Sequence, residues 1–247
     1  MGDNTEQQNE KRWGTSYSTM SIREAEKRLG VRFDSLKVVH FKAGDAGIDQ
    51  QMVDGIKETV YAHLVQYIEV EGYPTEANPD FNQANVSDLV LYTIGPVIAA
   101  VGKMGRQVRL RREKEIIPVD GAMGEMEEFV MIDQISVAED KFVLVIEAKK
   151  TSTGQAMKQI MLSLKNARDN QAGTVYGFVT TGREWQMLSY DGAVFQTTRE
   201  CGAVFLGMEV DKESWMEECS VIVDWLVVAL TTGGIVNKDV VVAEGFY

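Results

Sequence analysis

Apolar residues recur at two different periods along the chain, and the change of period divides it into two regions. Before residue 104 they recur close to every 3.6 residues, which predicts helices over residues 21–30, 51–70 and 87–104. The first begins at a serine and ends at a glycine, as capped helices do. Ser87 is expected to cap the third, and Pro96 to interrupt or kink it. The segment between the second and third helices is rich in turn formers and is expected to be a loop.

After residue 104 the period falls to two, which is typical of strands. Three strands are expected in succession, over residues 106–117, 127–137 and 141–149. An amphipathic helix over residues 153–169 follows them. Three shorter strands and a last helix complete the chain, over residues 174–181, 184–190, 193–196 and 211–230. The central order of helix, three strands, helix and strand predicts an α/β protein.

Composition limits the kind of protein that this chain is. Its 247 residues and 45% hydrophobic content are enough for one sizeable core. The longest apolar stretch, residues 220–230, is too short to cross a bilayer, and the first 20 residues have no apolar segment of the kind found in secretory signals. We therefore expect a soluble, intracellular protein that does not enter a membrane.

Few residues are available for cysteine or histidine chemistry. Cys201 and Cys219 are too few for a disulfide scaffold and lack the spacing of a zinc site, so both are expected to be reduced. His40 and His63 stand alone, which argues against histidine-rich metal centres. Any catalysis is expected to depend on carboxylates and lysine.

The charge distribution leaves a nucleic-acid partner open. The net charge of -12 counts against one, because phosphate binding depends on Lys and Arg. However, 11 of the 25 cationic side chains lie in two short stretches, residues 103–114 and 149–168. These stretches are either solvated faces, which is the commoner case, or surfaces that bind phosphate.

One carboxylate and one ammonium group are expected on the same face of the third strand. Alternation along residues 141–149 puts Glu147 and Lys149 on one face. A three-residue hairpin loop, residues 139–141, would set Asp133 of the preceding strand directly opposite Glu147, whereas a two-residue loop would put the two acids on opposite faces. With the three-residue loop, the two carboxylates are about 5 Å apart between Cβ atoms and need a counter-ion.

Magnesium suits such a pair of carboxylates, because Mg²⁺ takes one or two carboxylates and keeps several waters. Mn²⁺ is an expected substitute. The ion would polarise a phosphate and activate water, and Lys149 would orient the attacking water. The carbonyl group of Ala148 is a further candidate ligand. A purely structural ion trio of Asp133, Glu147 and Lys149 is the alternative interpretation.

These residues resemble the motif of the PD-(D/E)XK nuclease superfamily, which includes restriction endonucleases and recombination exonucleases. Asp133, thirteen further residues and then Glu147-Ala148-Lys149 stand on the second and third strands of the expected order. The resemblance covers residues 86–196. It implies a restriction-endonuclease-like core with a mixed β-sheet flanked by helices, to which an N-terminal helical layer and a C-terminal helix are added.

The resemblance also implies roles for further residues. Many relatives supply an acid from the first core helix, and Asp88 fits that position, with Glu58 or Glu71 as alternatives on the earlier helix. In one branch a glutamine on the second core helix is followed four residues later by tyrosine. Here Gln155 is followed by Gln159 and then by a serine. The basic stretches flank the implied site, and the residues expected to contact nucleic acid are Arg109, Arg111, Lys150, Gln155, Lys158 and Gln159.

The expected organisation is a flexible tail over residues 1–20, a helical segment and loop over 21–85, a nuclease-like core over 86–197 and a C-terminal helix and tail over 198–247. The expected function is a Mg²⁺-dependent nuclease that acts on DNA rather than RNA. The alternative is a catalytically inactive module with the nuclease fold that binds nucleic acid or a protein. A homodimer or another protein partner is open in both cases.

Overall fold

A computed structural model describes residues 19–75, 77–78, 80–116, 125–136, 139–148, 153–169 and 171–235, and the tail expected over residues 1–20 lies almost wholly outside these ranges. The helices are α2 (Ile22–Leu29), α3 (Gln50–Glu71), α4 (Gln83–Lys103), α5 (Thr153–Asp169), α6 (Lys212–Ser214) and α7 (Val221–Thr232). The strands are β1 (Lys37–Val38), β2 (Val108–Ile116), β3 (Glu125–Ser136), β4 (Glu139–Ala148), β5 (Val175–Thr180), β6 (Glu184–Tyr190), β7 (Phe195–Thr197) and β8 (Cys201–Gly202). Short turns are η1 (Phe33–Ser35), η2 (Ala43–Ala46), η3 (Met208–Val210) and the π-helical η4 (Trp215–Cys219).

The strands form one mixed sheet, which confirms the α/β class. Its order is β1-β7-β6-β5-β4-β3-β2, and β8 pairs with β6. Strands β2, β3 and β4 are an antiparallel meander, and α5 then carries the chain across to β5, which is parallel to β4. Strands β6 and β7 continue in antiparallel fashion. The predicted order of helix, three strands, helix and strand is confirmed.

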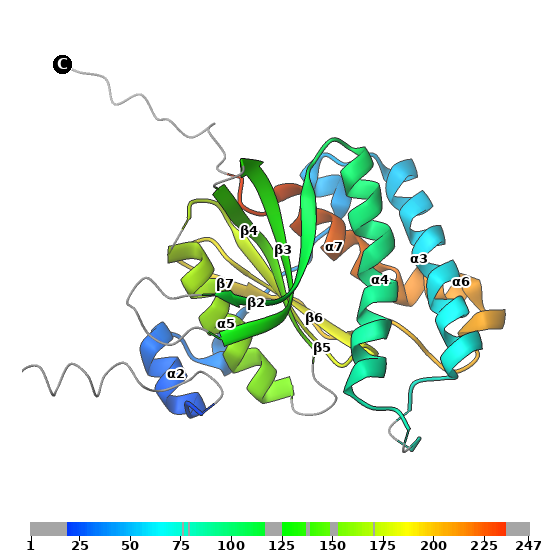
Figure 1. Cartoon of the computed structure of the whole chain (residues 1–247), viewed down its shortest axis with the longest axis horizontal. Coiled ribbons are helices and arrows are strands. Elements are labelled where there is room, and N and C mark those ends of the chain that lie inside the picture. The colour runs from blue at the N-terminus through cyan, green and yellow to red at the C-terminus, as the bar shows by residue number, and fades with distance from the viewer. Residues whose placement is uncertain are drawn as a thin grey trace, which may run out of the picture.

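Helices cover both faces of the sheet (Figure 1). Helices α3, α4 and α7 pack on one face, which we call the α4 face, against side chains such as Phe129, Ile146 and Phe178. Helix α5 packs on the other, the α5 face, against Val130 and Val145. Residues 129–132 of β3 and 144–147 of β4 alternate between the two faces, as the two-residue period of strands requires, so an odd or even residue number tells which face each belongs to. Val143 and Leu144 lie on the same face, where the register shifts.

Segments before and after residues 86–197 take part in the same core. Strand β1 pairs with β7 in parallel and so extends the sheet at one edge. Helices α3 and α7 share one buried cluster with the sheet and α4. The Asp224 carboxylate of α7 accepts a hydrogen bond from the Ala43 N–H in η2 at 3.2 Å. It also forms an ion pair with the Lys57 ammonium group of α3 at 2.7 Å. The described N-terminal and C-terminal helices therefore complete the core.

The structure corrects three helix predictions. Helix α4 begins at Gln83 with Asn82 as its cap, and Ser87 instead lies one turn inside it and donates to the Gln83 carbonyl. It is not interrupted at Pro96, and continues to Lys103. The expected last helix is divided into α6, the π-helical turn η4 and α7. By contrast, α2 has the predicted serine cap and C-terminal glycine, and α5 has the predicted bounds.

Helix α4 is also long and apolar enough to cross a membrane by length and composition, and half of the apolar window is buried within the protein. Its buried side chains contact the α3, α7 and sheet residues of the same cluster. A core helix of a folded domain has this composition for the same reason as a membrane span, since both are surrounded by apolar groups. We treat α4 as a core helix.

Candidate functional site

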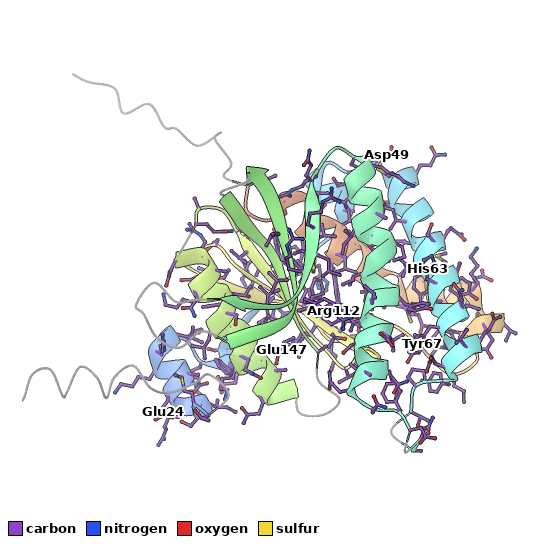
Figure 2. The ribbon with its side chains drawn as sticks, viewed as in Figure 1. Glu24, Asp49, His63, Tyr67, Arg112 and Glu147 are labelled. Carbon is purple, nitrogen blue, oxygen red and sulfur yellow. The ribbon has the colours of Figure 1, made fainter. Side chains whose placement is uncertain are left out.

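Glu147 is a carboxylate inside the body of the protein. Figure 2 labels it among the strands of the sheet. It lies one residue before the end of β4 and is only 3% exposed. It pairs in register with Val179 of β5 and alternates with Val145, and both valines belong to the buried cluster beneath α5. Glu147 therefore belongs to the α5 face. Ala156, in the first turns of α5, is part of the same cluster, so the beginning of α5 covers this end of the sheet.

The structure does not bring Asp133 to Glu147. The hairpin closes with Ser136 paired to Glu139, which is a two-residue loop, and Asp133 pairs with Lys141. Lys141 is six residues along β4 from Glu147, or about 20 Å at 3.3 Å per residue. The backbone position of Asp133 also has the parity of the α4 face. The predicted Asp133–Glu147 pair is therefore wrong, and the two-residue alternative describes the hairpin.

The register instead points to Glu128. Towards the end of β4, the β3–β4 ladder pairs Phe129 with Ile146. One further step along both strands sets the backbone of Glu128 opposite Glu147. Glu128 has the parity of Val130, which lies on the α5 face. Glu128 was missed because a partner for Glu147 was sought only with a three-residue loop. A two-residue loop sets position 128 opposite position 147.

The residues around Glu147 along the chain are only partly described. Lys149 and Lys150 lie outside the described residues, so the structure neither supports nor opposes their predicted roles. The Ala148 carbonyl, a predicted metal ligand, accepts a hydrogen bond from the Gln83 side-chain amide at 3.0 Å. Gln83 was missed because α4 was expected to begin four residues later.

Asp88, the acid expected from the first core helix, lies elsewhere. Its side chain is exposed on α4. Burial, with further contributions from Glu71 and Asp88, raises the pKa of Tyr67 in α3 to about 12, which places Asp88 beside α3. The alternatives also have other neighbours, because Glu58 pairs with Lys212 and Glu71 accepts from the Asn85 amide at 3.0 Å. None of these three acids forms a described group with Glu147.

Two of the residues predicted to contact phosphate lie at the surface, on the same sheet face as Glu147. Arg109 and Arg111 are exposed on β2, the outermost strand of the sheet. They pair with Ile132 and Val130, which belong to the α5 face. Arg112 has the opposite parity, and its guanidinium group lies 5.1 Å from the centre of the Phe129 ring. Arg109 and Arg111 thus share a sheet face with Glu147, and Arg112 does not.

The three residues of α5 that were predicted to contact nucleic acid differ in how far they are exposed. Gln155 is exposed and Gln159 is partly buried. Lys158 is fully buried, and its ammonium group donates to the Met20 carbonyl at 2.6 Å. The prediction that Lys158 lies at a phosphate-binding surface is therefore wrong for this conformation. The accepting residue, Met20, lies just before α2 and 138 residues earlier in the chain.

No group of three or more His, Cys, Asp or Glu side chains that could hold a metal ion occurs in the part of the chain whose side chains are described. Glu128, Asp133 and Lys149 are not in that part. A carboxylate pair at Glu128 and Glu147 would satisfy the preference of Mg²⁺ for one or two carboxylates and several waters. Comparison of the chain with family models, with curated proteins and with solved structures finds no match.

Proposed function

We propose that this chain is a metal-dependent nuclease that hydrolyses phosphodiester bonds, of DNA rather than RNA, and that Glu128 and Glu147 form its acidic pair. The observation that carries the proposal is Glu147, a buried carboxylate at the end of a central strand, facing the beginning of α5. Burying a carboxylate is costly unless a positive group or hydrogen-bond donors compensate it. A carboxylate that the fold keeps inside the protein is therefore a candidate functional group.

The order of elements supports the resemblance to the PD-(D/E)XK superfamily. Helix α4, the meander of β2, β3 and β4, helix α5 and strand β5 repeat the order on which the resemblance was based. Glu147-Ala148-Lys149 spans the end of β4 and the start of the connection to α5. The acid on the preceding strand is Glu128 in this proposal, which replaces Asp133.

A pair at Glu128 and Glu147 suits magnesium, with Mn²⁺ as a substitute. Residues directly opposite in an antiparallel pair have Cβ atoms about 5 Å apart, and like charges at that separation repel each other unless a cation lies between them. When bound, Mg²⁺ would stabilise negative charge on a phosphate group and activate water. Lys149, two residues after Glu147, would hold that water or a phosphate oxygen by hydrogen bonding.

The β3–β4 register can be tested directly, because it sets Glu128 opposite Glu147 and leaves Asp133, on the same strand, far from it. Cleavage of single-stranded DNA, double-stranded DNA and RNA would be measured with Mg²⁺, Mn²⁺ or EDTA. We expect EDTA to abolish cleavage and Glu128→Gln and Glu147→Gln to lower its rate about 100-fold or more, since each removes a metal ligand. Asp133→Asn is the matched control and is expected to cut at close to the wild-type rate, because its position is about 20 Å away.

Two outcomes would contradict this assignment. Loss of cleavage in Asp133→Asn with normal cleavage in Glu128→Gln would show that the acidic pair does not follow the register. Absence of cleavage by the wild type under every condition, with nucleic acid or a protein still bound, would favour the inactive binding module. The displacement of Asp133 from Glu147 is the observation that favours this second candidate.

A further inference from the structure

Arg183, in the turn between β5 and β6, is a cation that the described residues do not compensate. It is partly buried, and its guanidinium carbon lies 5.4 Å from the centre of the ring of Tyr73, just after α3. Its Nε is buried and has no hydrogen-bond acceptor in the part of the chain that the structure describes. The ion pairs among those residues involve other cations. A buried donor that lacks an acceptor destabilises a fold and is uncommon, so Arg183 is a candidate for a functional role.

The chemistry of the guanidinium group indicates what it can bind. Contact with an aromatic ring stabilises the cation without using its hydrogen-bond donors, and it restricts the side chain. The two terminal nitrogens of Arg183 form no hydrogen bond within the described residues. Their fork geometry matches two oxygens of one phosphate or carboxylate group. Arg183 on Tyr73 is therefore prepared to bind an anion.

The turn that carries Arg183 is well fixed by its neighbours. Gly182, at a φ of 80°, donates through its N–H to Thr180 Oγ1 at 2.8 Å. The Arg183 carbonyl accepts from the Ala203 N–H at 2.6 Å. A Cβ atom added to Gly182 would lie 3.1 Å from Leu89 Cδ2, so α4 packs directly on the turn. A binding residue on such a fixed support keeps its geometry before the ligand arrives.

The same turn lies at the end of the sheet that carries Glu147. Strands β4 and β5 are parallel with Ala148 opposite Thr180, so β5 enters the turn where β4 ends. The first turn of α4 is also at this end, because Gln83 donates to the Ala148 carbonyl at 3.0 Å. Two strand spacings of about 4.8 Å and three residues of about 3.3 Å separate Arg183 from Glu147, or roughly 14 Å between their backbones.

We propose that Arg183, held on Tyr73, binds a phosphate group of a nucleic-acid strand next to the phosphate that is attacked at Glu147. The strand crosses the ends of β4 and β5, from Glu147 on the α5 face to the side of the α4 face, where Tyr73 borders the buried cluster. Arg183 is the binding residue, and Tyr73 is a positioning residue that acts through it. The ligand class rests on the proposed function, whereas the available guanidinium group is a property of the fold.

The first test measures the affinity for a fluorescent single-stranded DNA oligonucleotide in EDTA over a range of salt concentrations. Arg183→Gln is expected to bind about ten-fold more weakly than the wild type and to reduce the salt slope by about 0.7, the value for one phosphate contact on a single strand. Arg183→Lys keeps the charge but loses the fork, so it should keep most of the slope and recover only part of the affinity.

Lys103→Gln is the matched control for the loss of one positive charge. Lys103 is exposed at the last residue of α4, about 30 Å along that helix from Gln83. Its substitution should leave the affinity within about two-fold of the wild type and the salt slope unchanged, because no phosphate contact is lost. Urea unfolding of both glutamine variants checks that each is folded.

The second test separates the two roles. Tyr73→Leu is expected to weaken binding about three-fold with an unchanged salt slope, because the charge stays and only its placement is lost. Tyr73→Phe keeps the ring and should bind like the wild type. In the Arg183→Gln background, Tyr73→Leu should have no further effect. A further loss in that background would overturn the positioning role, because Tyr73 would then contact the strand itself.

Equal effects of Arg183→Gln and Lys103→Gln on affinity and slope would overturn the role of Arg183, as would a wild type that does not bind the oligonucleotide. Because binding is measured without a metal ion, its outcome is independent of cleavage. A specific loss in Arg183→Gln, in a protein that cleaves under no condition, would remove the nuclease proposal and leave the Arg183 assignment intact. Cleavage by the wild type together with normal binding by Arg183→Gln would do the reverse.

Discussion

Buried charge is the feature that distinguishes individual residues in this protein. Among the described residues, Glu147, Lys158 and Asp224 are charged groups that are buried. Asp224 interrupts the apolar helix α7 and is held by Lys57 at 2.7 Å and by the Ala43 N–H at 3.2 Å. Because Asp224 has a cationic partner and a backbone donor, we assign it a structural role that joins three segments. Glu147 carries the proposed function.

The Lys57–Asp224 pair gives a stability prediction. Lys57→Met leaves a buried carboxylate without its counter-ion and is expected to lower the free energy of unfolding by about 3 kcal/mol. Adding Asp224→Asn should restore much of that loss, because the amide oxygen still accepts from Ala43. Lys165→Met is the control, since Lys165 and Asp169 form an exposed pair of the i,i+4 type, whose loss should cost at most about 0.5 kcal/mol. Urea unfolding of the four proteins measures these values.

The edge-strand arginines give a binding prediction. Arg109→Ala with Arg111→Ala is expected to weaken nucleic-acid binding and to reduce the slope of log affinity against log salt by about 2, one for each lost phosphate contact. Arg112→Ala removes the same charge from the opposite face, where it stacks on Phe129, and should change the salt slope little. If Arg109→Ala, Arg111→Ala and Arg112→Ala each changed the salt slope equally, the face of β2 would not determine binding.

Residue positions could be predicted from the sequence only where a local pattern determined them. Alternation alone placed Glu147 on a face of its strand, but its partner depended on the hairpin. The chain closes that hairpin with two residues, and the β3–β4 register shifts between Met131 and Ile132 and again near Ser136. Such irregularities leave no clear periodic signal. Burial of Lys158 depends on Met20, far away in the chain, and no local pattern reports that contact.

At the scale of elements, α5 packs closely against β5. A Cβ atom added to Gly177 would lie 2.7 Å from Ile160 Cγ1 and 3.2 Å from Leu164 Cδ1. Glycine at this strand position therefore sets how near α5 approaches the α5 face of the sheet. Because β4 and α5 are consecutive, the same contact helps to place the beginning of α5 over Glu147.

Gly177→Ala is expected to destabilise the protein by about 2 kcal/mol, because the new methyl group overlaps α5 side chains that are fully buried. Ile160→Ala makes room for it, so the double variant should lose clearly less than the two single variants together. Gly154→Ala is the control. Its added methyl group would have no neighbour within 4 Å, and alanine favours helix, so no destabilisation is expected. Additive losses in thermal or urea unfolding would contradict the proposed overlap.

Elements were predicted more accurately than residue pairings. The strand over 184–190 and the helix over 153–169 have the predicted bounds, because a clear period of two or 3.6 extends through each. The start of α4 was misplaced because Asn82 and Ser87 are both good capping residues, and the choice depends on Asn85 completing a capping box with Asn82. The π-helical turn η4 has no sequence signal that we can identify.

For the whole molecule, buried acids with raised pKa values predict how stability depends on pH. Burial raises the pKa of Cys201 from 9.0 to about 11 and that of Cys219 to about 12. It also raises the pKa of Tyr67 from 10.0 to about 12 and shifts that of Tyr176 upward. Above pH 9 the unfolded chain therefore releases protons that the folded protein retains.

A folded protein that binds more protons than its unfolded chain loses stability as pH rises. The urea midpoint is expected to be highest below pH 9 and to fall steadily between pH 9 and 11. A variant with Cys201→Ser and Cys219→Ala should show a shallower fall from pH 9 to about 11, because the folded thiols stay protonated until the pH approaches 11 to 12. The fall that remains above pH 10 comes from the tyrosines. An unchanged slope in that variant would mean that the thiols ionise equally well in the folded protein.

The pairing of β1 with β7 has a consequence for the order of events during synthesis. Lys37 must wait for Gln196 before it finds its partner strand. The apolar helix α4 can pack against α3 at once, but it must wait for the sheet and α7 before its buried side is complete. At translation rates of 5–20 residues per second, the ribosome needs roughly 6 to 25 s to proceed from the end of α4 to the end of α7. During that interval helix α4, which has the composition of a membrane span, is exposed without α7 packed against it. Nascent chains stalled before α7 should therefore be the form of this protein that chaperones bind most strongly.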